Sequence, residues 1–371
     1  MAALTQNNGS QTVLHVITDL NTGGAETMLT EMVLLQLREG NRPIIVSLMD
    51  GGSQFERLKK AGCQVIGLGM RRRRPSLIAL FRLAKLIRDY KPEFIQSWMY
   101  HADLASLISL YLSGRRRFIK LIWGIRCSDM DPSRYGLLFR VVLRLCALLS
   151  PFPDGIVANS YAGLDQHRSI GYRPRNFAVV QNGFDTDHYK FDANVRDRIR
   201  QSLKIANDAF VVGVVARVDP MKDYPTLLTA LSTMKGIFTL AIGRGTEELS
   251  SAPGLIRLGE RSDVADMLSA IDVLVVPSAF GEGLSNVIGE AMATGRPIVA
   301  TDVGDAAHLV GEAGIIVPPK DPVKLAAALE EVKGAAELRI KMGEIARDRI
   351  MQEFQLTHTI TKFSNFYSGL R

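Results

Sequence analysis

The stretch Pro277–Gly295, PSAFGEGLSNVIGEAMATG, decides the fold prediction because it joins a strand to a helix. The apolar run Val273–Val276 before it is predicted to be a buried strand, and the helix is expected to end at Gly295, with Pro297 behind it. The amides of Gly283 to Asn286 would then lie at the helix N-terminus, where unpaired donors and the helix dipole favour a phosphate. This order of elements predicts an anion-binding turn.

Two glutamates frame this turn. Glu282 lies on the predicted loop and Glu290 in the predicted helix, with seven residues between them. The two carboxylates could bind opposite ends of one ligand. A ligand with a phosphate between two polar ends suggests a nucleotide-sugar. Taken alone, both side chains could equally be solvated, because short motifs often match by chance.

Length and composition bound the class of protein. A chain of 371 residues with 47% hydrophobic residues predicts two domains with large buried sheets. No apolar run reaches the length of a membrane span, because Arg140 and Arg144 interrupt the longest candidates. The start of the chain lacks the features of a secretion signal, and the three cysteines are odd in number and widely spaced. We therefore expect a reducing, cytoplasmic location, without a zinc site or disulfide framework.

The positive charge is unevenly distributed along the chain. Residues 1–185 hold 24 Lys and Arg against 14 Asp and Glu, whereas the remainder holds 21 against 24. The excess that gives the net charge of +7 therefore lies entirely in the first half.

Strand-like and helix-like segments alternate along most of the chain. The alternation runs from Thr12 to Gln181, pauses at a polar turn and linker from Asn182 to about Asn194, and restarts at Val211. This pattern predicts an α/β protein with two Rossmann-like parallel-sheet domains that face each other across a cleft. The expected divisions are a disordered N-terminus at 1–12, a first domain at 13–183 and a second at 184–354.

Glycines follow the first predicted strand. Gly23 and Gly24, in NTGGAE, open a long predicted helix and would let backbone approach a bound group closely. Tight packing of strand and helix explains them about as well.

Cations and a histidine follow two other strands. Arg217 and Lys222 come after Val211–Ala216 and could grip a diphosphate, the arginine as a fork and the lysine as a point charge. A solvated loop with surface ion pairs is the alternative. His101, in WMYHADL after Phe94–Trp98, could bind a sugar or phosphate, or serve in helix capping or packing.

Paired aspartates occur twice, at Asp129 with Asp131 and at Asp185 with Asp187. Such pairs can hold a divalent metal through oxygen ligands. Both lie in loops next to proline or glycine, so we predict turn and capping roles and no metal site.

A basic face is predicted on the first domain. Its parts are the run Arg71–Arg74, the run Arg115–Arg117 and an apolar helix at 137–149 that carries Arg140 and Arg144. A basic amphipathic segment beside arginine clusters is typical of contact with anionic lipid headgroups. A solubilising face with an ordinary buried helix is equally compatible. Nucleic acid is disfavoured because no recognition motif accompanies the charge.

With both predicted domains in view, the chain closely resembles glycosyltransferase family 4, also called the group 1 glycosyltransferases, which have the GT-B fold and retain anomeric configuration. The resemblance covers nearly the whole chain. Its carriers are GGAE (Gly23–Glu26), WMYHADL, NGFD (Asn182–Asp185), Arg217 with Lys222, GRG (Gly243–Gly245) and FGEGLSNVIGEAMATG. WMYHADL and WGIRCSD resemble a bacterial branch associated with surface polysaccharides.

The resemblance implies a role for residues of the second domain, which would bind the donor. Arg217 and Lys222 would neutralise the donor diphosphate and the charge that grows on the leaving group. Glu282 would hold sugar hydroxyls and Glu290 the ribose hydroxyls. The phosphates would be held by the backbone of Gly283, Leu284, Ser285 and Asn286. The backbone of Arg257 and Leu258 would border the base.

The resemblance also implies how the first domain and the reaction work. His101 would lie near the transferred sugar, and Gly23 and Gly24 would line the gap between diphosphate and acceptor. The donor phosphate would take the acceptor proton, with no protein nucleophile, no cofactor and no catalytic metal. The last segment, 355–371, would pack back on the first domain. Many relatives carry a bulky residue at the position of Ser285 and an apolar one at that of Gly289, so the identity of the sugar is left open.

We therefore expect a retaining glycosyltransferase in the cytoplasm, peripheral to the inner leaflet of the plasma membrane. It would move a sugar from a UDP- or GDP-linked donor to a lipid-linked glycan in bacterial surface-polysaccharide synthesis. A sugar-nucleotide epimerase or phosphorylase of the same fold is one alternative, and a non-catalytic protein that binds lipid or nucleic acid is another. A dehydrogenase is disfavoured because the dinucleotide fingerprint is missing.

Overall fold

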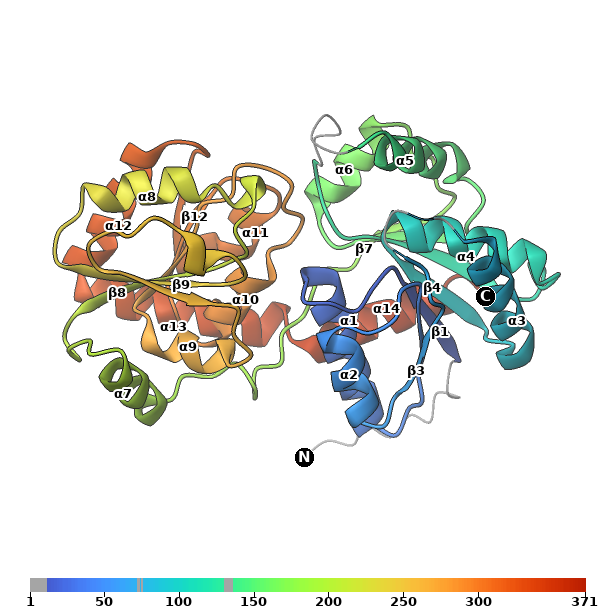
Figure 1. Cartoon of the computed structure of the whole chain (residues 1–371), viewed down its shortest axis with the longest axis horizontal. Helices are drawn as coiled ribbons and strands as arrows, with labels where there is room; N and C mark the ends of the chain where they lie inside the picture. The colour runs from blue at the N-terminus through green and yellow to red at the C-terminus, as the bar shows by residue number, and fades with distance from the viewer. Residues whose placement is uncertain (1–11, 72–73, 75, 130–135) are drawn as a thin grey trace. The chain divides into compact units, whose positions relative to one another are not determined.

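The computed structural model describes residues 12–71, 74, 76–129 and 136–371, and its contacts divide the chain into two units (Figure 1). Among these residues, unit 1 holds those up to Arg126, residues 136–180 and Ile360–Arg371. Unit 2 holds residues 127–129 and Gln181–Thr359. Residues 1–11, most of the predicted disordered N-terminus, lie outside the described residues. No helix in the described part of the chain is both long and apolar enough to cross a membrane.

Unit 1 is built on a seven-stranded parallel sheet in the order β3-β2-β1-β4-β5-β6-β7. The strands are β1 (Val13–Ile17), β2 (Ile44–Ser47), β3 (Gln64–Gly67), β4 (Phe94–Trp98), β5 (Lys120–Ile125), β6 (Gly155–Ala158) and β7 (Phe177–Val179). The helices are α1 (Gly24–Arg38), α2 (Ser53–Lys60), α3 (Leu77–Tyr90), α4 (Tyr100–Leu112), α5 (Leu137–Leu149) and α6 (Tyr161–Ser169).

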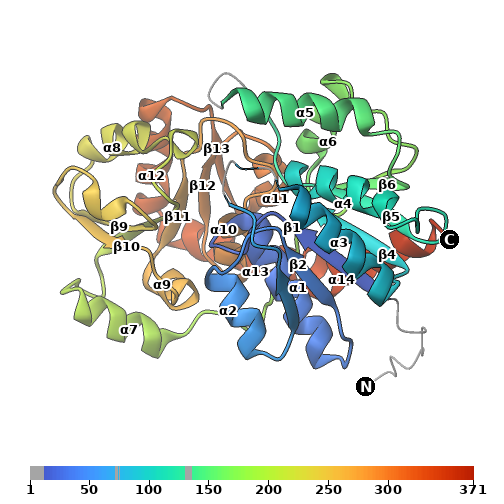
Figure 2. The same cartoon turned by 45° about the vertical axis from the view of Figure 1, so that its right-hand side comes forward.

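Burial explains the strands of unit 1. All five residues of β1 and of β4 are buried, as expected for strands of a parallel sheet covered on both faces. Helices α3, α4 and α5 pack against one another in succession, as Figure 2 also shows.

The last helix, α14 (Leu356–Ser368), begins in unit 2 and ends in unit 1. Its Tyr367 ring stacks on Phe94 of β4 with centroids 5.1 Å apart, and its Phe363 ring lies 6.2 Å from that of Trp98. Residues 360–371 therefore supply part of the core of unit 1.

Unit 2 is built on a six-stranded parallel sheet in the order β10-β9-β8-β11-β12-β13. The strands are β8 (Phe210–Val215), β9 (Ile237–Ile242), β10 (Leu255–Gly259), β11 (Val273–Val276), β12 (Ile298–Thr301) and β13 (Gly314–Val317). The helices are α7 (Ala193–Ser202), α8 (Tyr224–Ser232), α9 (Val264–Ala270), α10 (Asn286–Ala293), α11 (Ala306–Val310), α12 (Pro322–Gly334) and α13 (Ala336–Glu353). The prediction of an α/β protein with two Rossmann-like parallel sheets is confirmed.

The strand orders locate the point in each sheet where a ligand can bind. The order reverses between β1 and β4 in unit 1 and between β8 and β11 in unit 2. Ligands of open α/β sheets bind beyond the carboxyl ends of the strands at such a reversal, because the flanking connections diverge there. The segments that leave β1, β4, β8 and β11 are those that carry most of the predicted site residues.

Candidate active site

Helices begin at both reversal points without a side-chain cap. Helix α10 begins after Ser285, α1 after Gly23 and α4 after Met99, and none of these three preceding residues caps its helix with its own side chain. By contrast, Asp223 caps α8, which follows β8 at the unit 2 reversal, and Asp321 caps α12. The first amides of α1, α4 and α10 are therefore suited to an anionic ligand.

The loop after β8 supplies two cations. Arg217 follows the strand, and its Nε lies 3.3 Å from Asp219 Oδ2, with the side chain 43% exposed. Lys222 ends a short 3₁₀ helix, Pro220–Lys222, which Asp219 caps. Its ammonium group forms an ion pair with Glu282, and both side chains are largely buried. The structure thus brings together the predicted lysine and glutamate from two loops.

Glu282 is held as an anion. Ser278 Oγ donates a hydrogen bond of 2.7 Å to the same carboxylate oxygen that pairs with Lys222. Burial alone would raise the pKa of Glu282, but Lys222, the Ser278 hydroxyl and nearby Arg217 together lower it below its usual value. The carboxylate is therefore ionised at neutral pH and can only accept hydrogen bonds.

The backbone around Glu282 is fixed by close neighbours. Gly304, at φ 62°, lies so close to the carbonyls of Glu282 and Gly283 that a side chain there would overlap them. The Ser128 hydroxyl donates to the Glu282 carbonyl, and the Asp305 amide donates to the Gly283 carbonyl at 2.9 Å. Sequence reasoning missed these supports because they come from distant segments.

The position predicted to border a base lies farther along the sheet. Arg257 and Leu258 are on β10, an edge strand separated from β8 by β9. The Arg257 guanidinium donates a 2.6 Å hydrogen bond to the Leu249 carbonyl, so its charge is directed at a neighbouring loop. The backbone at Gly259 is tied to Gly243 by a 2.7 Å hydrogen bond, which aligns the ends of β9 and β10.

Helix α10 carries the second glutamate. Glu290 is partly buried in the middle of the helix, and its carbonyl accepts the hydrogen bonds that end it at Thr294. Asn286, at the first position, accepts a 2.6 Å hydrogen bond from Asn182. The start of α10 is thus tied to the chain segment that enters unit 2.

Gly289 has a packing role that its sequence context did not reveal. A Cβ atom at this position would overlap the ring of Phe184, from the NGFD segment. The glycine therefore makes room for a buried aromatic ring, which explains its presence without reference to a sugar.

We expect Gly289→Ala to destabilise unit 2 by about 1–3 kcal/mol, because overpacking displaces a buried ring. Chemical denaturation measures this change. Gly334→Ala is the matched control, since no heavy atom lies within 4 Å of a Cβ there, and it should be neutral. Equal stability of the two variants would contradict the packing role of Phe184.

In unit 1 the glycines and the histidine lie at the reversal between β1 and β4. Gly23 precedes α1 and Gly24 begins it, and the atoms nearest to a Cβ on Gly23 belong to the flexible carboxylate of Glu26. His101 lies exposed in the first turn of α4. Met99 before it has φ 74°, a conformation that costs a non-glycine residue about 1 kcal/mol or more. The turn that presents His101 is therefore strained and must be held by its surroundings.

The paired aspartates have different outcomes. Asp185 Oδ1 accepts hydrogen bonds of 3.1 Å from the amides of Asp187 and His188, which is the predicted turn role. Asp131 lies outside the described residues, as do Arg72 and Arg73 of the predicted basic run.

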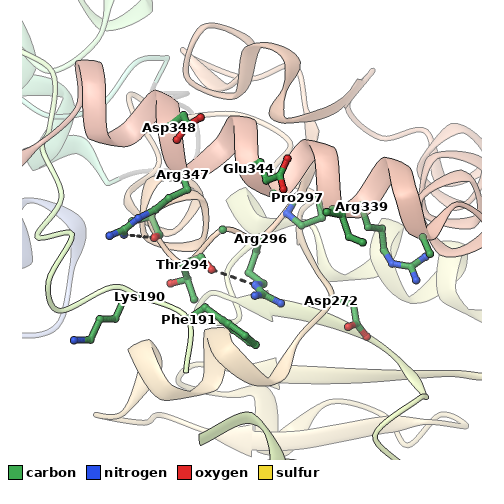
Figure 3. A pocket seen from close by; sticks show the side chains of 15 residues that line it. Lys190, Phe191, Asp272, Thr294, Arg296, Pro297, Arg339, Glu344, Arg347 and Asp348 are labelled. Carbon is green, nitrogen blue, oxygen red and sulfur yellow. Dashed lines mark hydrogen bonds between the residues drawn. The ribbon is translucent and has the colours of Figure 1, made fainter. Parts of the chain in front are cut away.

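A cavity of about 750 Å³ lies at the opposite, amino edge of the unit 2 sheet (Figure 3). It is bounded by α13, by the turn before β12 and by Lys190 with Phe191. Its arginines mostly bind helix C-termini: Arg347 donates to the Ala293 carbonyl of α10, and Arg339 to the Val332 carbonyl of α12 at 2.8 Å. These charges stabilise helix dipoles. Since the cavity lies at the amino edge of the sheet, it is separate from the predicted site at the carboxyl edge.

Two family models match the chain. The model described as Glycosyltransferase Family 4 matches residues 22–188, and the model described as Glycosyl transferases group 1 matches residues 209–333. The chain belongs to the group 1 glycosyltransferases and has the GT-B fold. It is therefore a glycosyltransferase, as its sequence predicts.

Curated relatives and solved structures agree with this family. The capsular polysaccharide biosynthesis glycosyltransferase CapM of Staphylococcus aureus is 24% identical over 301 residues, 75% of this chain and 77% of CapM. The lipopolysaccharide core biosynthesis glycosyltransferase LpsE of Rhizobium meliloti is 26% identical over 256 residues, 64% of this chain and 71% of LpsE. Anabaena HepE, solved with UDP and glucose, has the same fold, with a TM-score of 0.85 and 22% identity over 96% of this chain and 99% of HepE.

Proposed function

We propose that this enzyme transfers a sugar, with retention of configuration, from a UDP- or GDP-linked donor to a lipid-linked glycan in bacterial polysaccharide synthesis. The names of CapM and LpsE support the polysaccharide context. HepE was solved with UDP-glucose, which supports a nucleotide-sugar donor.

The observation that carries the proposal is the buried ion pair of Lys222 and Glu282 beside the uncapped start of α10. A donor diphosphate at that helix start would attract the Lys222 ammonium group. Glu282 would then be free to accept hydrogen bonds from the sugar hydroxyls. One movement of a lysine side chain would thus both neutralise the leaving group and prepare the sugar subsite.

The remaining residues complete this donor site in our proposal. Arg217 joins Lys222 at the diphosphate, and Glu290 accepts from the ribose hydroxyls. The amides of Gly283 to Asn286 hold phosphate oxygens, and His101 with Gly23 and Gly24 serves the sugar and acceptor from unit 1. The donor phosphate accepts the acceptor proton, so the reaction needs neither a cofactor nor a metal ion.

A thermal-shift screen with UDP, GDP and their common sugars tests the donor class. We expect one nucleotide series to stabilise the protein, since a ligand at 100 times its Kd adds about 2.7 kcal/mol. Product analysis then separates transfer from isomerisation or phosphorolysis without an acceptor. No shift with any member would contradict the proposal and favour a non-catalytic binding protein.

The proposal also includes attachment to an anionic membrane surface through unit 1. Helix α5 buries only Val142, Leu143 and Cys146, while Leu137 and Leu148 are 71% and 72% exposed. It is therefore not an ordinary buried helix. Further exposed apolar side chains lie on α3 and before β5: Leu77, Ile78, Phe81 and Phe118.

Some cations of this face are exposed, and one forms an ion pair within unit 1. Arg140 and Arg144 are exposed on α5, as are Arg71 and Arg74 before α3. Arg116, in contrast, forms a 2.8 Å ion pair with Asp154 and donates to the Phe152 carbonyl, so it serves the fold. Exposed apolar side chains interspersed with exposed cations favour a lipid surface.

We expect Leu148→Asp to weaken binding to phosphatidylglycerol vesicles about tenfold, because a carboxylate replaces an inserted apolar group. Vesicle co-sedimentation measures this binding. The matched control is Val323→Asp, an equally exposed apolar residue of α12 in unit 2. Equal binding of both variants and wild type, or no preference over phosphatidylcholine, would contradict membrane attachment through this face.

A further inference from the structure

A buried carboxyl group lies directly behind the turn that carries His101. Asp103, two residues further along α4, is 1% exposed. Its Oδ1 lies 2.6 Å from the Ser97 hydroxyl oxygen of β4 and 3.4 Å from the amide nitrogen of Gly124 of β5. Its own amide donates to the Met99 carbonyl at 3.0 Å. One side chain therefore joins α4 to the ends of two central strands.

We propose that Asp103 is a positioning residue for glycosyl transfer, which holds the strained turn of Met99 and His101 in place through Ser97 and Gly124. This inference rests on the proposed role of His101. Asp103 belongs to the WMYHADL motif, but the sequence does not reveal this role, since the side chain is buried and its partners lie on β4 and β5.

The hydrogen-bond geometry favours a protonated Asp103. The Ser97 hydroxyl has one hydrogen, yet its oxygen lies 2.6 Å from Asp103 Oδ1 and 3.2 Å from the Ile122 carbonyl. If Asp103 is protonated, it donates to Ser97, and Ser97 donates to Ile122. If Asp103 is ionised, Ser97 must donate to it, and the Ile122 carbonyl loses this bond. The complete chain of hydrogen bonds therefore needs the proton on Asp103.

The electrostatic surroundings agree with this arrangement. Burial raises the pKa of Asp103 to about 7, although the bonds from Ser97 and Gly124 and the charge of Arg126 act in the opposite direction. The other ionisable groups around Asp103 and Arg126 are neutral. Burial raises the pKa of the Cys146 thiol on α5 and of Tyr367 on α14, and burial lowers the pKa of His15 on β1 to about 3.

The raised pKa has a defined effect on stability. Between about pH 4 and pH 7 the unfolded chain ionises Asp103 while the folded protein keeps its proton. The folded state then binds more protons, so the contribution of Asp103 to the free energy of unfolding falls as the pH rises through this window. Asp103→Asn should remove this part of the pH dependence, because asparagine does not titrate.

Two variants test the positioning role. With its amide nitrogen at the Oδ1 position, asparagine donates to Ser97 as the protonated acid does and gives up only the 3.4 Å contact with the Gly124 amide. Asp103→Asn therefore mimics the protonated form and should keep kcat within about twofold at pH 6. We expect the wild-type kcat to decline above pH 7, where Asp103 ionises, and the Asp103→Asn variant to lack this decline. Asp103→Ala should lower kcat about tenfold or more at every pH without changing the donor KM, because a misplaced turn affects the reacting geometry.

The matched control is Ser106→Ala, a buried residue of the same helix whose hydroxyl has no hydrogen-bond partner among the described residues. It should leave the pH profile unchanged. The rates are measured with the donor that gives turnover in the nucleotide-sugar screen, and stability by denaturation at pH 5 and pH 8. An Asp103→Asn profile identical to wild type, or loss of activity equal to that of Asp103→Ala, would overturn the inference. A wild-type protein that turns over no donor would overturn the proposed function as well.

Discussion

Lys222→Ala should reduce the rate of sugar transfer by about 10²- to 10³-fold, the effect of removing one group that stabilises charge in the transition state. Lys222 reaches Glu282 from a neighbouring loop, and both side chains are largely buried. The lysine therefore sits where water is largely excluded and its charge is weakly screened. Steady-state rates with the donor identified by the screen measure the loss.

The experiment must separate a loss of catalysis from a loss of folding, because Lys222→Ala leaves the Glu282 carboxylate buried without its partner. The double variant Lys222→Ala with Glu282→Gln removes the unpaired charge, so it should regain stability and remain inactive. Lys324→Ala, at an exposed lysine of α12 that lies 3.9 Å from the capping Asp321, is the control for loss of charge. A Lys222→Ala enzyme that is stable and transfers at the wild-type rate would refute the assignment.

Asp272→Ala should destabilise unit 2 by about 3–5 kcal/mol, the cost of removing one partner from a buried charge network. The Asp272 carboxylate accepts bonds of 2.7 Å from Arg196 and 2.8 Å from Arg200, and one of 2.7 Å from the Val211 amide at the start of β8. Arg200 is fully buried. Without Asp272, two guanidinium groups remain close together without a carboxylate partner.

Urea denaturation, followed by far-ultraviolet circular dichroism, measures this change. The comparison variant is Asp263→Ala, which breaks the more exposed pair with Arg261 and should cost less than about 1 kcal/mol. Similar losses for both variants would mean that burial does not set the cost of breaking these pairs.

The sequence predicted the fold well because both sheets rest on apolar runs separated by helices of regular period. The approach of Lys222 to Glu282 was also foreseeable, since parallel strands on either side of a reversal end at the same edge. Ser278, which holds Glu282, stands at the end of β11 and could have been found by the same reasoning.

Other features were not accessible from local patterns. Helix α7 was not predicted: its first residues were assigned to the linker and the rest to no element. The reason is that it buries just Ile199 and Arg200 and has no apolar stripe. Its place depends on Arg196 and Arg200, whose carboxylate partner lies more than 70 residues away. The packing of Gly289 on Phe184 and the support of Glu282 by Ser128 likewise depend on distant segments, and a single sequence does not reveal such pairs.

The placement of residues 360–371 in unit 1 has a consequence for co-translational folding. Unit 2 is nearly continuous along the chain, whereas the β4 surface formed by Phe94 and Trp98 receives Phe363 and Tyr367 only after the whole of unit 2 has been synthesised. The unit that emerges first is therefore the last to be completed. Until then this aromatic surface is uncovered, and a nascent chain that stalls before residue 360 would expose it to chaperones.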